Sequence, residues 1–96
     1  MSKENKMFIN KTKNGKNNIS GVQIATYRKA LHLSQRKLAD KLQILGLDVD
    51  KNAIQRMESG QRFITDIELI YLSKALNVTV CALLDFDSEI PILENL

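Results

Sequence analysis

Apolar residues recur along the chain at spacings of three and four, the period of amphipathic helices, and no alternating strand pattern is seen. Five such stripes lie between short polar stretches. They predict helices over residues 21–31, 35–45, 51–59, 66–76 and 80–84. The fourth segment is apolar on nearly two faces, so we expect it to be the most central helix. The pattern therefore predicts an all-α fold with short connections.

Each predicted helix is preceded by the same arrangement of residues. An apolar residue is followed by Ser, Thr or Asp, whose oxygen can accept hydrogen bonds from the unpaired N–H groups of the first helical turn. A second apolar residue stands four positions later, at the spacing of a hydrophobic staple. The five predicted caps are Ser20, Ser34, Asp50, Thr65 and Thr79. Ser20 with Gln23, and Thr65 with Glu68, also match full capping boxes.

Helix ends and buried faces can be assigned in the same way. Gly60 and Asn77 follow predicted helix ends, where a left-handed residue is favourable. Aromatic residues make up only 5% of the chain and Trp is absent, so aliphatic residues must supply most of the core. The expected inner positions of the first three helices are Ile24, Tyr27, Leu31, Leu38, Ala39, Leu42, Leu45, Ile54 and Met57.

Two charged residues fall on these inner faces. Arg28 follows Ile24 by four positions, and Glu58 follows Ile54 by four. An isolated charge on an inner face costs several kcal/mol, so each needs a partner. We expect Arg28 and Glu58 to pair and so to tie the first helix to the third. The alternative is that both side chains extend separately to water.

Size and composition limit the possible chemistry. The 96 residues suffice for one domain. One Cys and one His cannot build a metal site or an internal disulfide. We expect Cys81 to be a small buried thiol and His32 an exposed turn residue. Without a Gly-rich phosphate loop or a catalytic combination around His32, the sequence supports neither an enzyme nor a bound cofactor.

Targeting signals are not visible in the sequence. No segment approaches the roughly 18 consecutive apolar residues of a membrane helix. The first twenty residues carry five Lys and no apolar run, so no secretory signal is seen. We therefore expect a soluble, cytoplasmic protein that does not bind membranes.

Charge is distributed unevenly. Residues 1–62 hold 13 Lys and Arg against 5 Asp and Glu, a net charge of +8, whereas residues 63–96 hold one Lys and six acids, a net charge of −5. A positive surface of this size can attract a polyanion. It can also be a merely solvated face.

The third predicted helix carries donor side chains on its outer face. Once Ile54, Met57 and Glu58 are assigned to the inner side, the outward residues are Lys51, Asn52, Gln55 and Arg56. Arg and Lys suit the O6 and N7 acceptors of guanine, and Asn suits the N6 and N7 of adenine. A surface helix can also carry these residues for solubility alone.

Three segments, LSQRKLADKL, VDKNAIQRMESGQR and TDIELIYLSKALNV, resemble the Cro/phage-repressor (XRE-like) helix-turn-helix family over residues 19–84. The matching marks are Ser34, Gln35, Leu38, Ala39, Val49, Ile54 and Glu58. The resemblance implies a five-helix, lambda-repressor-like bundle. Its second and third helices form the DNA-binding motif, and the third lies in the major groove.

The resemblance also implies residue roles. The positions that read bases in the family are Lys51, Asn52, Arg56 and Gln55, although the Gln55 position often faces the groove wall. Those placed near DNA phosphates are Gln35, Arg36, Gln61 and Arg62. Arg28 and Glu58 match the family's structural pairing of the first and third helices, in agreement with the burial argument.

One departure from the family lies between Ala39 and Val49. This stretch is several residues longer than the usual helix-turn-helix connection, whose turn has about 3–4 residues. Leu42 and Leu45 continue the apolar stripe, so we interpret the extra residues as another turn of helix. The tilt of the third helix then becomes an open question.

The flanking segments allow more than one interpretation. Residues 1–18 are rich in Lys and Asn, with a turn signal at Asn14-Gly15. They are expected to be a basic flexible arm, either solvated or following the DNA backbone or minor groove. Residues 85–96 form an acidic, apolar tail that can cap the core or contact a neighbouring subunit, and Pro91 argues against a long final helix.

The sequence thus predicts a sequence-specific, repressor-like transcription regulator, which is expected to bind double-stranded DNA as a homodimer on a pseudo-palindromic site. The alternative is an antitoxin or adaptor, a protein-binding module in which the apolar C-terminal tail binds a partner.

Overall fold

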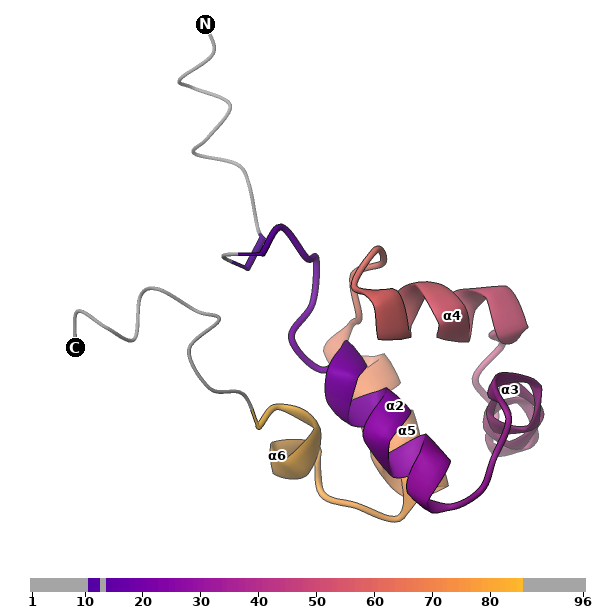
Figure 1. The fold of residues 1–96 in the computed structure, drawn as a ribbon. Coiled ribbons are helices and arrows are strands. Elements are labelled where there is room, and N and C mark those ends of the chain that lie inside the picture. The colour runs from indigo at the N-terminus through magenta and orange to yellow at the C-terminus, as the bar shows by residue number, and fades with distance from the viewer. Residues whose placement is uncertain (1–10, 13, 86–96) are drawn as a thin grey trace, which may run out of the picture.

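The computed structural model describes residues 11, 12 and 14–85 (Figure 1). Within them the chain forms five helices and no strand: α2 (Gly21–Ala30), α3 (Gln35–Leu45), α4 (Lys51–Ser59), α5 (Asp66–Leu76) and α6 (Val80–Leu83). The predicted all-α, five-helix fold is confirmed. The first and the last helix each end one residue earlier than predicted.

The helices enclose a single aliphatic core. α2 packs against α4, α5 and α6, while α3 packs against α4 and α5. α4 lies along one edge of the bundle, across the ends of its neighbours (Figure 1). The largest fully buried side chains are Ile24, Leu38, Leu42, Ile54, Met57, Leu72, Leu76 and Leu83. Each helix contributes at least one of them, so the displacement of any helix would expose part of the core to water.

Four of the five predicted caps are present, with distances of 2.8–3.1 Å to the backbone N–H that they accept from. They are Ser34, Asp50, Thr65 and Thr79. Thr65 and Glu68 form the complete capping box. Gly60 and Asn77 end their helices in the left-handed region, at φ of 82° and 58°. These local predictions are confirmed.

The predicted cap at Ser20, and with it the box to Gln23, is wrong. Ser20 has helical backbone angles and its side chain makes no capping bond. The Oδ1 atom of Asn18 accepts from the N–H of Gly21 at 2.8 Å instead. Asn18 is held by contacts with distant residues, and this placement brings its amide, rather than the Ser20 hydroxyl, to the first turn of α2.

Several residues expected to be inside are exposed. Leu31 lies just after the end of α2 and is 43% exposed, and Leu45 is the last residue of α3 and is 42% exposed. On α5 only one face is buried, since Ile67 and Ile70 are 65% and 49% exposed. α5 was expected to be the most central helix, and it does pack against α2, α3 and α6, as many helices as α2 contacts. Its second apolar face, however, is left exposed in the described chain.

Cys81 was also predicted incorrectly, whereas His32 was predicted correctly. Cys81 is exposed. α6 has four residues, and Leu83 occupies its buried side. Cys81 precedes Leu83 by two positions, which is roughly the opposite face of a helix. His32 is exposed in the turn after α2, with φ of 59°.

The long connection of the helix-turn-helix is partly helix, as predicted. α3 continues to Leu45, and Gly46 then ends it with φ of 112°. The N–H of Leu47 donates to the carbonyl oxygen of Leu42 at 2.9 Å, and Nε2 of Gln43 donates to that of Val49 at 2.7 Å. These two bonds hold the connection against α3 and so determine where α4 begins.

Candidate nucleic-acid interface

The inner side of α4 is fixed by apolar packing. Ile54 and Met57 have no exposed surface, and Val49, just before the helix, is 5% exposed. The carboxylate of Asp50 caps the first turn by accepting from the N–H of Ala53 at 2.8 Å. Burying a side chain of this size contributes about 1.5–3 kcal/mol, so these residues hold one face of α4 firmly to the core.

The carboxylate of Glu58 completes this inner side. Nε and Nη2 of Arg28 donate to its two oxygens at 2.6 and 3.0 Å, and Nε2 of Gln35 donates to Oε1 at 2.9 Å. Arg28 also donates from Nη1 to the carbonyl oxygen of Leu33 at 2.7 Å. The predicted pairing of α2 with α4 is confirmed, and neither side chain extends separately to water.

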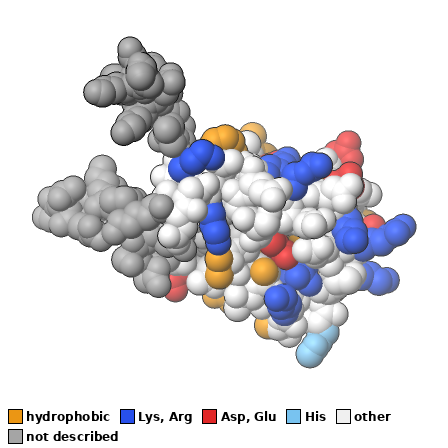
Figure 2. Space-filling view, turned by 45° about the horizontal axis from the view of Figure 1, so that its top comes forward, with side chains coloured by type: hydrophobic (Ala, Val, Ile, Leu, Met, Phe, Trp, Pro, Cys, Tyr) orange, Lys and Arg blue, Asp and Glu red, His pale blue; other side chains and the backbone are white. Residues whose placement is uncertain are grey.

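The outer side of α4 carries the four side chains predicted to read bases. Lys51, Asn52, Gln55 and Arg56 are all exposed, and no other part of the described chain covers them. Figure 2 shows the molecule with this edge turned toward the viewer, and Lys and Arg side chains are spread across the face with a few acidic ones between them. Their contact with bases stays a prediction.

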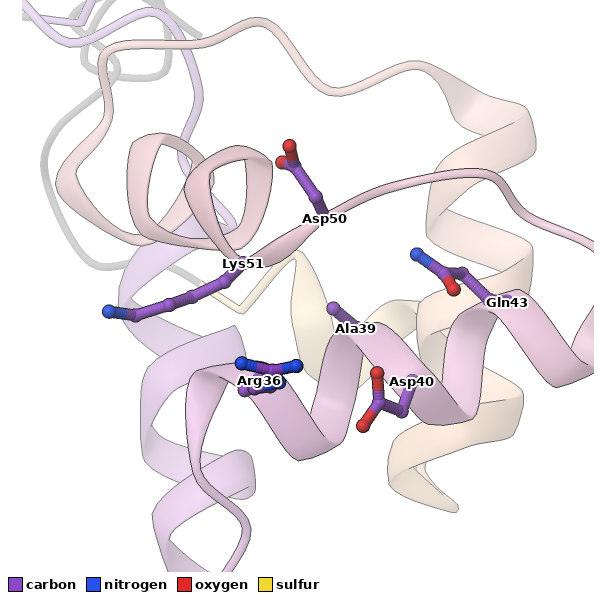
Figure 3. A pocket seen from close by; sticks show the side chains of 6 residues that line it. All are labelled: Arg36, Ala39, Asp40, Gln43, Asp50 and Lys51. Atoms are coloured by element: carbon purple, nitrogen blue, oxygen red, sulfur yellow. The ribbon is translucent and has the colours of Figure 1, made fainter.

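An open polar hollow of about 340 Å³ lies in the angle between α3 and α4. Its lining residues are Arg36, Ala39, Asp40, Gln43, Asp50 and Lys51. Arg36 and Lys51 extend to the same side of it, while Asp50 turns toward the first turn of α4 (Figure 3). Arg36 of α3, which is predicted to contact phosphate, therefore lies beside Lys51 of α4, which is predicted to read bases.

Two of the residues predicted to bind phosphate are engaged inside the protein. The amide of Gln35 is half-buried and donates to Glu58. The guanidinium of Arg62 donates to both oxygens of Glu68, at 2.9 and 2.8 Å, and to the carbonyl oxygen of Phe63 at 3.1 Å. Gln61 is exposed. The phosphate contacts of these residues stay predictions, and Gln35 and Arg62 have structural partners that the sequence did not indicate.

Glu68 is a buried carboxylate that accepts from three donor atoms, two of Arg62 and one of Thr65. Besides Arg62, the N–H of Thr65 donates to its Oε1 at 2.9 Å. Burial alone raises the pKa of Glu68, but the hydrogen bonds from Arg62 and Thr65 and the charge of Arg62 outweigh it, so the pKa lies below its usual value. The same hydrogen bonds act in the opposite direction on Arg62 and raise the pKa of its guanidinium. This pair anchors the loop after α4 (residues 60–64) to α5.

Asn18 is a positioning residue that the sequence analysis missed. Its Nδ2 donates to the carbonyl oxygens of Met57 at 3.0 Å and Arg62 at 2.7 Å, while its Oδ1 accepts from Gly21. A Cβ at Gly21 would collide with the carbonyl oxygen of Met57, so the start of α2 lies directly on the end of α4. An amide three residues before a helix, which offers both donors and an acceptor, was the only local signal.

The comparisons with known proteins agree with this arrangement. The helix-turn-helix family model matches residues 24–83, well over half of the chain. A similar solved structure is the restriction-modification controller protein C.AhdI from Aeromonas hydrophila. The sequences are 26% identical, the match covers 67% of this chain and 86% of that one, and the TM-score is 0.59. Among curated proteins, none matches.

The chain therefore belongs to the XRE-like helix-turn-helix family, as its motifs suggested. It is a DNA-binding transcription regulator of that kind.

The described residues offer no other obvious site. None of their helices is long and apolar enough to cross a membrane. In the same part of the chain, no group of three or more His, Cys, Asp and Glu side chains could hold a metal ion.

Proposed function

We propose that this protein is a sequence-specific, repressor-like regulator that binds double-stranded DNA as a homodimer, with α4 in the major groove. The observation that carries the proposal is the division of α4 into two sides. Ile54, Met57 and Glu58 hold the helix to the body, and every long polar residue on the opposite side is exposed.

Specificity would come from base contacts and affinity from phosphates. Lys51, Asn52 and Arg56 offer the donor and acceptor groups that fit guanine and adenine edges in the major groove. Arg36, exposed on α3 beside Lys51, is suited to a backbone phosphate, and each such contact releases counterions from the duplex. This arrangement supports the division between base reading by α4 and positioning by the neighbouring helix.

Selection of bound DNA from a random oligonucleotide pool tests the proposal. A two-fold symmetric motif is expected, because a homodimer reads two half-sites. Lys51→Ala and Asn52→Ala should each cost about 1–3 kcal/mol at particular base pairs and relax the preference there. Lys74→Ala, which removes an exposed Lys from the last turn of α5, is the matched control and should leave the selected motif unchanged. Equal binding of the parent and the Lys51, Asn52 and Arg56 triple alanine variant would refute base reading by α4.

The exposed apolar face of α5 supports the homodimer. Ile67 and Ile70 are one turn apart on the same helix face, and Phe63 in the preceding loop is 57% exposed. Exposed apolar residues that gather on one face are typical of protein interfaces. The double variant Ile67→Ser, Ile70→Ser is therefore expected to sediment as a monomer, whereas the parent sediments as a dimer. A parent that stays monomeric with and without DNA would contradict this part of the proposal.

A further inference from the structure

The residues before α2 form an ordered segment that packs on the end of α4. We call residues 11, 12 and 14–18 the N-terminal strap. Its first part is a closed turn, in which the N–H of Thr12 donates to the carbonyl oxygen of Lys16 at 2.9 Å. The N–H of Gly15 donates to the carbonyl oxygen of Thr12 at 2.9 Å, and that of Lys16 donates to Oγ1 of Thr12 at 3.1 Å. The turn signal at Asn14-Gly15 is confirmed, with φ of 79° at Gly15.

The second part of the strap is hydrogen-bonded to α4 and the loop after it. The backbone N–H of Asn17 donates to the carbonyl oxygen of Gly60 at 2.7 Å, and its Nδ2 donates to that of Gln61 at 2.9 Å. With the two bonds from Asn18, four carbonyl oxygens at and beyond the end of α4 accept from the strap. Figure 1 shows this segment beside the loop after α4. Residues 1–10 and 13 of the expected arm lie outside the described residues.

These bonds change the electrostatics of the end of α4. The last carbonyl groups of a helix are unpaired and carry a partial negative charge, which repels phosphate. At this end Asn17 and Asn18 cover carbonyl oxygens with N–H donors. Of these acceptors only the carbonyl oxygen of Met57 lies in the last turn of α4, and it also accepts from the N–H of Gly60. The strap therefore lowers the obstacle to an anion in part, mainly along the loop that follows the helix.

The strap also brings two cations there. Nζ of Lys11 donates to Oδ1 of Asn17 at 2.7 Å, so its ammonium group lies beside the loop. The aliphatic stem of Lys16 packs over Gly60. A Cβ added at Gly60 would lie 2.7–2.8 Å from the Cβ, Cγ and Cδ atoms of Lys16. Arg62, the cation expected to serve this loop, is instead paired with Glu68. Among the described residues, the strap therefore adds Lys11 and Lys16 to Arg56, the exposed cation in the last turn of α4.

We propose that the N-terminal strap is a second DNA-backbone contact, in which Lys11 and Lys16 bind phosphates of the duplex next to the C-terminal end of α4. The inference rests on the proposed function, because it requires α4 to face the duplex. It assigns the phosphate contact at this end to the strap rather than to Arg62. Held cations are suited to this role, since less side-chain freedom is lost on binding than for a mobile chain.

The test measures the salt dependence of binding by the full chain to the duplex selected above. For the double variant Lys11→Ala, Lys16→Ala, the slope of log K against log salt should fall by about 2, since each phosphate contact contributes about 0.9. Affinity should fall for every duplex sequence, with base preference unchanged. The double variant Lys11→Arg, Lys16→Arg retains both charges and should keep the parent's slope.

Lys29→Ala, Lys74→Ala is the matched control, because it removes two exposed Lys from the ends of α2 and α5. A strap variant whose slope and affinity equal those of the parent, while the triple alanine variant of α4 loses specific binding, would overturn the strap inference and leave the proposed function standing. A parent that binds no duplex would overturn both. Urea unfolding of each variant should match the parent, and a loss of DNA binding that follows a loss of folding would also count against the strap.

Discussion

The two ends of α4 are held in different ways. At its N-terminal end, Lys51 and Asn52 are exposed, and the local support comes from the Asp50 cap and from a connection that runs beside α3. At its C-terminal end, Glu58 is bound by two other helices, and the carbonyl oxygens of the last turn and the following loop accept from the strap.

This difference fits the role proposed above for each end of α4. A helix that enters a DNA groove must expose the residues of its leading turns, so little of the protein can cover them. The opposite end and the inner face must then fix the orientation of the helix. The structure meets both requirements by placing most of the polar contacts behind α4 and at its C-terminal end.

The largest effect is expected from breaking the buried ion pair. Glu58→Ala leaves the charge of Arg28, 10% exposed, without a partner and should lower the free energy of unfolding by about 3–5 kcal/mol. Urea unfolding followed by circular dichroism at one protein concentration measures it. Gln55→Ala, on the exposed side of the same helix, is the control and should change stability by less than about 0.5 kcal/mol.

A second variant keeps this prediction testable if Glu58→Ala does not fold. Arg28→Met with Glu58→Leu removes both charges and should be destabilised by less than Glu58→Ala, because no buried charge is left unpaired. If Glu58→Ala alone costs less than about 1 kcal/mol, the pair behaves like a surface salt bridge and the clamp at this end is weaker than described.

The next effect is expected at Asn18. Asn18→Ala leaves the carbonyl oxygens of Met57 and Arg62 and the N–H of Gly21 without their partner, and should cost about 1–3 kcal/mol. Thermal or urea unfolding measures it. Asn17→Ala removes one side-chain bond to the loop and should cost less. If the two substitutions are equally mild, Asn18 does not organise this end of α4.

At the other end of α4, the cap should contribute a smaller amount. Asp50→Ala removes the acceptor for the N–H of Ala53 and should cost about 1 kcal/mol, whereas Asp50→Ser retains an acceptor and should cost much less. Urea midpoints of the two variants give the comparison. A cost at Asp50 equal to that at Glu58 would remove the contrast between the two ends.

The smallest effect concerns acid. Because the pKa of Glu68 is lowered in the folded chain, its contribution to stability is fully present above its usual value, about 4.3, and is lost as the pH falls through the lowered pKa. As the pH falls from about 6 through the lowered pKa of Glu68, the free energy of unfolding should therefore decrease more for the parent than for Glu68→Gln. Urea unfolding at a series of pH values measures this, and parallel curves for the two proteins would argue against a lowered pKa.

Much of the fold could be predicted from the sequence because its signals are local. Helix spans follow from periodicity, and caps such as Asp50 and Thr65 act on N–H groups within three residues of them. The Arg28–Glu58 pair was predictable despite its separation in the chain. A charge on an inner face must find a partner, and Arg28 and Glu58 are the opposite charges that the inner faces of the first and third helices offer each other.

Tertiary structure decided what depended on contacts between distant residues. Ser20 is of a residue type that often caps helices, but Asn18 accepts from the first turn of α2 instead. The end of α4 and the following loop hold the side-chain amide of Asn18 in place. Arg62 was predicted to bind phosphate and is paired with Glu68. Both outcomes have one physical reason: a polar side chain takes the partner that the packed chain brings within reach, and the order of residues alone does not specify that partner.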